Sequence, residues 1–283
     1  MNTKGDIAGS SAAWGAQYRL TASDAWRIPS ARMGRAVTDA LVEYAAPVPG
    51  MDVLDIASGT GEPAITLAER VGPNGSVAAL DQSADLLEIA KKRAVDRGLT
   101  NFVAHHADAH TLPFPDAVFD LATCRFGIMF FRDPGGALKE LRRVLKPGAR
   151  ACFVVWGPFE QPYWQSMMGR VVHHVGGPVI PPGAADPFSF AVPGSLSNVL
   201  RGAGFDTVQE ETKTVPWSWP GTPESVWEYA RAVAAPLKPL LDRVPEAKWP
   251  AIHADVRLAL EKLYDGEQIN FGATVVFASG KKI

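Results

Sequence analysis

Cysteine and long apolar runs are both scarce in this sequence of 283 residues. The two cysteines, Cys124 and Cys152, each lie in an apolar stretch, which predicts reduced thiols in the core and neither a disulfide nor a metal pair. There is no run of about 18 uninterrupted apolar residues, and no apolar segment follows the lysine near the N-terminus. We therefore expect a cytoplasmic protein without an integral membrane segment.

An excess of one charge is also lacking, because 28 lysines and arginines nearly balance 30 aspartates and glutamates. The basic residues are spread along the chain and form no patch that would neutralise a phosphate backbone, so we expect no nucleic-acid partner. Histidines, cysteines and carboxylates do not occur at metal-ligand spacing, and we expect no metal site. The apolar share of 47% is typical of an ordinary globular protein.

The apolar pattern alternates short strands with helices from about residue 51. Such alternation implies right-handed crossovers and therefore predicts an α/β, Rossmann-like fold: a doubly wound, mostly parallel seven-stranded sheet with helices on both faces. An N-terminal helix is indicated by apolar residues at Met33, Val37, Leu41 and Ala45. We expect strands at 53–56, 77–81, 102–104, 119–124, 149–156, 208–215 and 272–278, and helices at 63–70, 86–98, 136–145, 195–203 and from 222.

The chain divides into three parts by this pattern. Residues 1–50 are predicted to be an N-terminal helical cover, and residues 51–157 the Rossmann-like core. After residue 157 the alternation stops in a stretch rich in proline, glycine and aromatic residues. Residues 158–283 are predicted to form a helical lid or insertion together with the last strands of the same sheet.

The strongest local signal is an apolar strand containing Asp55 that runs into the turn Gly59-Thr60-Gly61. Glycine lacks a Cβ atom, so it adopts left-handed backbone angles easily and lets a ligand approach the main chain. The helix that follows offers unpaired N–H groups at its first turn. Alone, however, this Gly-x-Gly pattern is as typical of a bare strand-to-helix turn.

Two further carboxylates follow the next two strands, because the second ends in Asp81 and the third is followed by Asp108. Ligands of open parallel sheets bind outside the carboxyl ends of the strands, so this set predicts a nucleoside site. Asp81 would accept hydrogen bonds from a ribose diol, and Asp108 with the N–H of Ala109 would bind an adenine. Taken singly, Asp81 is also a candidate cap for the following helix, and Asp108 a simple loop acid.

Residues 35–157 resemble the core of the class I S-adenosylmethionine-dependent methyltransferases, and most of all their UbiE/Coq5-like small-molecule branch. One departure from that family is Ala57, where glycine is usual; alanine is tolerated there if its backbone angles are ordinary. The resemblance rests on Val53-Leu54-Asp55 to Gly61, Asp81-Gln82-Ser83, Asp108 to Phe114, Phe119-Asp120 and Glu140 to Gly148.

This resemblance implies S-adenosyl-L-methionine as the cofactor and S-adenosyl-L-homocysteine as its product. Asp55 would organise the first loop near the methionine amino group, and Asp81 would hold the ribose. Trp14 and Tyr18 would fold over the cofactor, although such a pair is as typical of plain helix packing. The other residues expected to bind the cofactor are Ala57, Ser58, Gly59, Gly61, Gln82, Asp108, Ala109, Arg125 and Phe126.

The implied reaction is methyl transfer to oxygen or carbon of a small apolar or aromatic acceptor of quinol, phenol, polyketide or terpenoid type. Since the sulfonium already activates the methyl group, proximity and orientation would supply most of the catalysis. His173, His174 and Glu160 are candidates for a general base, although such residues more often lie on the surface. Acceptor contacts are expected from Met129, Tyr163, Trp164 and Phe188, unless these form the insertion's own core.

Two alternatives remain open from the sequence. The first is a non-catalytic S-adenosylmethionine-binding or regulatory module that keeps the cofactor cleft alone. The second is a nicotinamide-dependent oxidoreductase, but its Gly-x-Gly-x-x-Gly fingerprint needs a third glycine where this chain has Ala64. The sequence makes no prediction of an oligomeric state.

Overall fold

A seven-stranded sheet forms the centre of the protein in the computed structural model, which describes residues 26–233 and 235–283. Its strands are β1 (Asp52–Ile56), β2 (Ser76–Asp81), β3 (Phe102–His106), β4 (Phe119–Arg125), β5 (Leu145–Trp156), β6 (Asp206–Val215) and β9 (Ala273–Lys281). They lie in the order β3-β2-β1-β4-β5-β9-β6. Strands β1 to β5 are parallel to one another, whereas β9 runs antiparallel to both β5 and β6.

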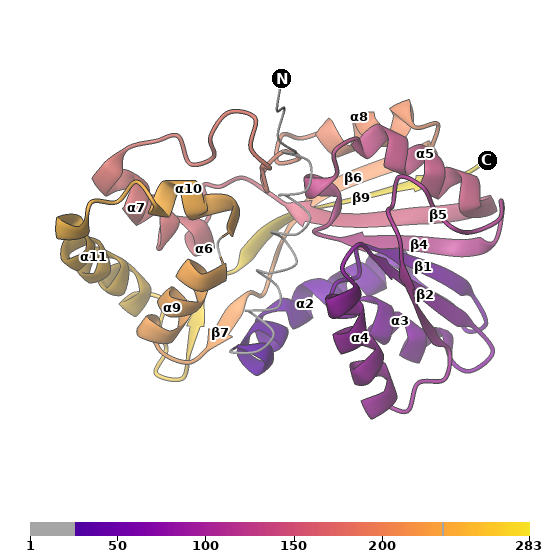
Figure 1. Ribbon diagram of the computed structural model, residues 1–283, viewed down its shortest axis with the longest axis horizontal. Coiled ribbons are helices and arrows are strands. Elements are labelled where there is room, and N and C mark those ends of the chain that lie inside the picture. Colours follow the sequence, from indigo (N-terminus) through magenta and orange to yellow (C-terminus); the bar gives the residue numbers. More distant parts are fainter. Residues whose placement is uncertain (1–25, 234) are drawn as a thin grey trace, which may run out of the picture.

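Helices cover both faces of this sheet (Figure 1). One face carries α2 (Arg27–Ala45), α3 (Ala64–Val71) and α4 (Ala84–Asp96), drawn below the sheet in Figure 1. The other face carries α5 (Pro134–Val144) and α8 (Ser195–Gly202), drawn above it. The predicted doubly wound, mostly parallel α/β fold of seven strands is therefore confirmed.

Burial on both faces explains why the inner strands are almost continuous apolar runs. Every residue of β1 from Val53 to Ile56 is buried, as are all residues of β2 after Ser76. Strands of a parallel sheet covered by helices on both sides have this character. In α2, the four apolar residues that predicted this helix are all buried against the sheet. Each such aliphatic side chain contributes roughly 1.5–3 kcal/mol through the loss of its contact with water.

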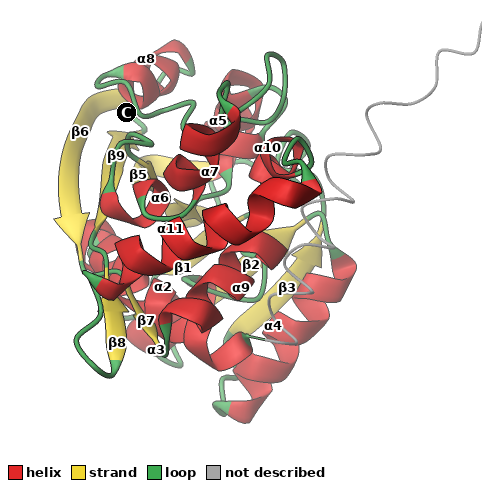
Figure 2. Ribbon diagram, turned by 90° about the vertical axis from the view of Figure 1, so that its left-hand side faces the viewer, coloured by secondary structure: helices red, strands yellow, loops and turns green. Residues whose placement is uncertain are grey.

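Two chain segments, residues 157–194 and 216–272, form a separate group of elements that we call the cap. In Figure 1 its helices lie to the left of the sheet, and in Figure 2 α9 and α11 lie in front of the strands. The elements of the cap are α6 (Pro162–Gln165), α7 (Met168–Val175), β7 (Ser218–Pro220), α9 (Pro223–Val233), the 3-10 turn η2 (Ala235–Leu237), α10 (Lys238–Leu241), η3 (Glu246–Lys248), α11 (Trp249–Glu261) and β8 (Gln268–Asn270). A further 3-10 turn, η1 (Ile128–Phe130), follows β4.

The structure differs from the sequence-based expectation at two places. The fifth strand begins at Leu145 rather than at residue 149, because Lys146-Pro147-Gly148 continues the strand instead of ending the helix before it. The antiparallel pair of β7 and β8 was not predicted. The division of the chain at residues 50 and 157 stays a prediction. Within the described ranges, no helix combines the length and the apolar character needed to cross a membrane.

Candidate functional site

The strand order reverses between β1 and β4, because β2 and β3 lie on one side of β1 and β4 and β5 on the other. Ligands of open parallel sheets bind outside the carboxyl ends of the strands at such a switch point. The register aligns these ends, since Ile56 is opposite Leu80 and Asp81 is opposite His106. The three predicted carboxylates therefore lie at or just beyond one rim of the sheet.

Asp81 ties the loops after β1 and β2 together. One carboxylate oxygen accepts a hydrogen bond from the backbone N–H of Gly59 at 2.8 Å, and the other accepts one from Ser83 at 2.9 Å. The alternative role of Asp81 as helix cap is wrong, because the Ser83 hydroxyl caps α4 by accepting from the N–H of Leu86 at 3.3 Å. Asp81 is thus a buried acceptor that fixes the glycine loop.

The loop after β1 makes repeated use of left-handed backbone angles. Gly59 has φ +54° and Gly61 φ +103°, and a Cβ at Gly61 would meet Ile65 of α3 at 2.7 Å. Ala57 has φ +54° as well, so its angles are not ordinary for a residue with a Cβ, and the condition under which alanine would be tolerated at this position is not met. A left-handed conformation costs a residue with a Cβ roughly 1–2 kcal/mol. The Ala57 methyl group packs on Gly127, where an added Cβ would overlap it.

Asp55 is completely buried at the end of β1. One carboxylate oxygen accepts a hydrogen bond from the Thr123 hydroxyl at 2.6 Å, and the backbone N–H of Ala64 also stabilises the charge. Burial outweighs these bonds and raises the pKa of Asp55 to about 7. The second carboxylate oxygen has no hydrogen-bond partner within the described part of the chain, and the same holds for the buried hydroxyl of Ser58 nearby in the turn.

Asp108 lies beyond β3, where it is joined to the second strand through Gln82. Its carboxylate accepts from both the N–H and the ring Nδ1 of His110, at 2.9 and 2.6 Å, and from the Gln82 side chain. Partial burial tends to raise the pKa of Asp108, but these hydrogen bonds outweigh it and lower the pKa below its usual value. Gln82 and Asp108, two residues expected to bind the cofactor, are therefore in contact, and Ala109 is buried next to Asp108 in the chain.

Two arginines brace the loop of residues 57–61. Arg93 of α4 donates to the carbonyl of Thr60 at 2.5 Å and forms an ion pair with Glu62 at 3.1 Å. Arg125, at the end of β4, donates from Nε to the carbonyl of Glu62 at 3.3 Å. Arg93 was not predicted, because its partners come from a different strand-helix unit and no local sequence pattern marks it.

A group of aromatic rings adjoins this loop. Phe126 follows β4 directly and stacks on Trp156 at the end of β5, with ring centres 4.7 Å apart. Trp156 in turn stacks with Tyr163 at 5.9 Å, while Trp164 and Trp217 meet it edge-on at 5.2 and 5.1 Å. We call these five residues, together with Phe188 and Phe271, the aromatic cluster.

The aromatic cluster brings together most of the residues expected to contact an acceptor. Tyr163, Trp164 and Phe188 belong to it, and the sulfur of Met129 accepts from the backbone N–H of Trp156 at 3.4 Å. Trp156 and Trp217 are not among the acceptor contacts that were predicted individually. The sequence does carry a signal for Trp156, because this residue ends a strand close to the switch point. Trp217 lies in a distant segment, and no feature of the sequence around it indicates a place in the site.

The three candidate bases lie elsewhere in the cap. His173 and Glu160 are exposed, and His174 of α7 pairs with Asp255 of α11 at 3.4 Å. No contact described in the structure joins these three to the aromatic cluster. Their role as a base stays a prediction.

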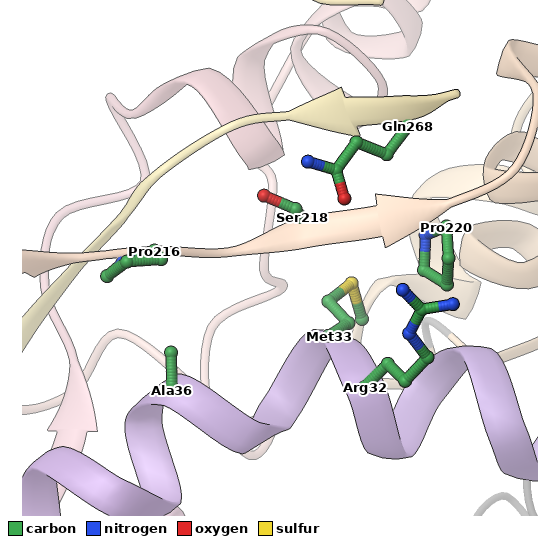
Figure 3. Close-up of a pocket in the computed structure, with 7 residues that line it drawn as sticks. All are labelled: Arg32, Met33, Ala36, Pro216, Ser218, Pro220 and Gln268. Carbon is green, nitrogen blue, oxygen red and sulfur yellow. The ribbon is translucent and has the colours of Figure 1, made fainter.

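Trp14 and Tyr18 lie outside the described residues. A hollow of about 140 Å³ lies between α2 and the β7–β8 pair and contains none of the predicted site residues (Figure 3). Binding sites for small molecules usually measure 300–1,000 Å³, so this hollow is too small to be the expected cleft. No group of three or more histidine, cysteine or carboxylate side chains suited to a metal ion occurs in residues 26–233 and 235–283.

Comparison with known families gives a match across about half of the chain. The model of the ubiE/COQ5 methyltransferase family matches residues 28–168. Two curated relatives are each named ubiquinone/menaquinone biosynthesis C-methyltransferase UbiE. The protein from Cupriavidus pinatubonensis is 41% identical over 119 residues, which are 41% of this chain and 49% of that protein. The protein from Ralstonia pickettii is 34% identical over 182 residues, which are 59% and 72% of the two chains.

The extent of these matches differs between relatives. The chain spans about half the length of the Cupriavidus protein, and the cap lies mostly outside the family match. Among solved structures, the YcgJ protein from Bacillus subtilis superposes with a TM-score of 0.56 at 22% identity, covering 87% of this chain and 97% of that one. Identity at this level supports the common fold alone.

Proposed function

The chain belongs to the ubiE/COQ5 methyltransferase family, and from this premise we propose that it moves a methyl group from S-adenosyl-L-methionine to oxygen or carbon of a small apolar or aromatic acceptor. The observation that carries the proposal is the joining of three strand-end carboxylates at the switch point. Asp81 binds the glycine loop at Gly59, and Asp108 is linked through Gln82 to the end of β2. Asp55 lies buried beneath the same loop.

The residues present fit the proposed cofactor in their chemistry. The unpartnered carboxylate oxygen of Asp55 and the unpartnered hydroxyl of Ser58 are buried acceptors at one turn, as an ammonium group requires. Asp81 fixes the glycine loop by accepting from two backbone N–H groups, and its carboxylate is the group proposed to meet the ribose hydroxyls. Asp108 and the backbone of Ala109 would meet the adenine. When bound, the cofactor supplies an electrophilic methyl group on its sulfonium.

The chain itself would contribute position and exclusion of water. Arg93 and Arg125 hold the carbonyls of the loop, and Asp81 holds its N–H, so the loop is fixed before any ligand arrives. The aromatic cluster supplies an apolar wall beside the switch point. Holding two reactants at 3–3.5 Å in the right orientation removes about 7–11 kcal/mol from a barrier, which suits a reaction that needs little acid-base help.

The acceptor is proposed to be of quinol, phenol, polyketide or terpenoid type. Support for a quinol comes from the names of the curated relatives, which are C-methyltransferases of quinone biosynthesis. The aromatic cluster is consistent with this class, because flat rings pack well on aromatic side chains. No nucleic-acid partner is proposed.

Incubation with methyl-labelled cofactor and a panel of quinols, phenols and prenyl compounds tests the proposal. We expect label in at least one ring compound, with its position assigned by mass spectrometry. Binding of S-adenosyl-L-homocysteine without transfer to any acceptor would favour a non-catalytic module. Calorimetric binding of a nicotinamide dinucleotide but not of S-adenosyl-L-homocysteine would favour an oxidoreductase.

A further inference from the structure

Two indole N–H groups in the aromatic cluster have no hydrogen-bond partner among residues 26–233 and 235–283. The Nε1 atoms of Trp164 and Trp217 are buried and make no hydrogen bond with any described residue. Two other buried indoles of the described chain do have partners: Trp219 donates to the Ser225 hydroxyl at 2.8 Å, and Trp227 to the ring of His253 at 2.7 Å. Indole N–H groups in folded proteins normally find a partner, so two exceptions in one cluster call for an explanation.

The place of these two donors connects them to the proposed reaction. Both indoles lie edge-on to Trp156, at 77° and 82° to its plane. Trp156 stacks on Phe126. The residue after Phe126 is Gly127, which packs on the Ala57 methyl group. The donors therefore belong to the wall beside the glycine loop, on the side of the switch point formed by β4 and β5.

The chemistry of the cluster restricts what would satisfy them. Phenylalanine has no polar atom and tryptophan offers only a donor, so Tyr163 is the one ring of the cluster that carries an acceptor. A ligand rich in donors would leave the indoles unpaired, whereas carbonyl or phenolate oxygens would pair with them. A flat ring that carries such oxygens also fits a wall of aromatic faces and edges.

We propose that Trp164 and Trp217 bind the acceptor by donating their indole N–H groups to its ring oxygens, and that the acceptor is a flat, quinone-like or phenolic ring. This inference rests on the proposed methyl transfer and adds the feature by which the acceptor is recognised. Hydrogen bonds to the ring oxygens would orient the ring against the loop of residues 57–61. The two tryptophans are then binding residues, and no proton leaves them.

Phenylalanine replacement of either tryptophan tests this, because it keeps a ring and removes the N–H. The probes are 2-hydroxy-1,4-naphthoquinone and naphthalene, which share a ring system and differ in oxygen, each titrated into protein saturated with S-adenosyl-L-homocysteine. We expect Trp164→Phe and Trp217→Phe to weaken binding of the hydroxynaphthoquinone by about three- to tenfold each. Binding of naphthalene should change less than about twofold.

NMR of the indole N–H groups gives a second measurement, which is made on the wild-type protein and does not depend on the affinity of a variant. In protein labelled with ¹⁵N-tryptophan, the Nε1–H signals of Trp164 and Trp217 should move downfield with the oxygen-bearing probe and not with naphthalene. The signals of Trp219 and Trp227 serve as internal controls, since their N–H groups are already bonded.

Three results would overturn the inference: equal affinity of wild type and both variants for the hydroxynaphthoquinone, indole signals that do not respond to it, or no binding of it at all. Failure of the proposed function appears separately, as a wild-type protein that neither binds S-adenosyl-L-homocysteine nor transfers label. If the wild type binds S-adenosyl-L-homocysteine and transfers label, but the two indole signals do not respond to the probe, the proposed function stands and the proposed role of the two tryptophans is wrong.

Discussion

Replacement of Asp55 by asparagine is expected to stabilise the protein above pH 7 and to have much less effect at pH 5. The carboxyl group is fully buried, and burial raises its pKa from 3.8 to about 7. Because this pKa is higher in the folded than in the unfolded protein, the folded state binds more protons between these values. Stability is therefore lost as pH rises through this window.

The magnitude follows from the size of the pKa change. A rise from 3.8 to about 7 corresponds to roughly 4 kcal/mol, at 1.36 kcal/mol per pKa unit. Between pH 5 and pH 7 the wild type should lose about 2.3 kcal/mol that Asp55→Asn does not lose, because the folded-state carboxyl group is half ionised at pH 7. The asparagine side chain cannot ionise. Its NH₂ group would take the place of the Asp55 carboxylate oxygen that has no partner among the described residues.

Urea unfolding followed by tryptophan fluorescence at pH 5 to 9 measures this difference. Asp52→Asn removes one negative charge from a more exposed position on the same strand and controls for net charge. Thr123→Val removes the hydroxyl that lowers the pKa of Asp55, so its loss of stability should extend to higher pH. A constant difference between Asp55→Asn and wild type across this range would refute the reasoning.

Three other changes probe the loop. Asp81→Ala should weaken binding of S-adenosyl-L-homocysteine by roughly 1.5–3 kcal/mol in calorimetry, because it removes the acceptor that fixes the loop; exposed Asp85→Ala is the control, and an unchanged affinity of folded Asp81→Ala would count against the role. Gly127→Ala should cost about 1–3 kcal/mol in urea unfolding through overlap with Ala57. Adding Ala57→Gly should recover part of it, and strict additivity would contradict the contact. Arg93→Met should lower stability by roughly 1–3 kcal/mol, since it strips a loop carbonyl of its donor; no loss of stability would show that the bond is dispensable.

The parallel core was predictable because its signals are local. Strands β1 and β2 are buried on both faces and read as largely apolar runs; β2 ends in a carboxylate, and β1 carries one at its penultimate position. The start of α9 could also be predicted, because Thr222 caps this helix and Pro223 is its first residue. Local propensity and burial agree at these places, so the sequence alone indicates the structure.

The parts that were missed depend on contacts between distant segments. Three-residue strands such as β7 and β8 carry too little pattern to be recognised, and only their mutual pairing creates them. Trp217 follows β6, and β9 lies between β6 and the strand that ends in Trp156. No local pattern therefore links the two rings, which meet only in the folded protein. The left-handed angles of Ala57 contradict its own residue preference, and tertiary packing must impose them.

The insertion of β9 between β5 and β6 sets the order in which the chain can assemble during its synthesis. Strand β6 leaves the ribosome before β9, yet in this sheet its ladder partner is β9. Until residues 273–281 are made, β5 has an open edge and β6 has no place in the sheet. A nascent chain at that stage exposes hydrogen-bonding groups that invite pairing with other chains, so this interval is when we expect the newborn protein to depend most on chaperones.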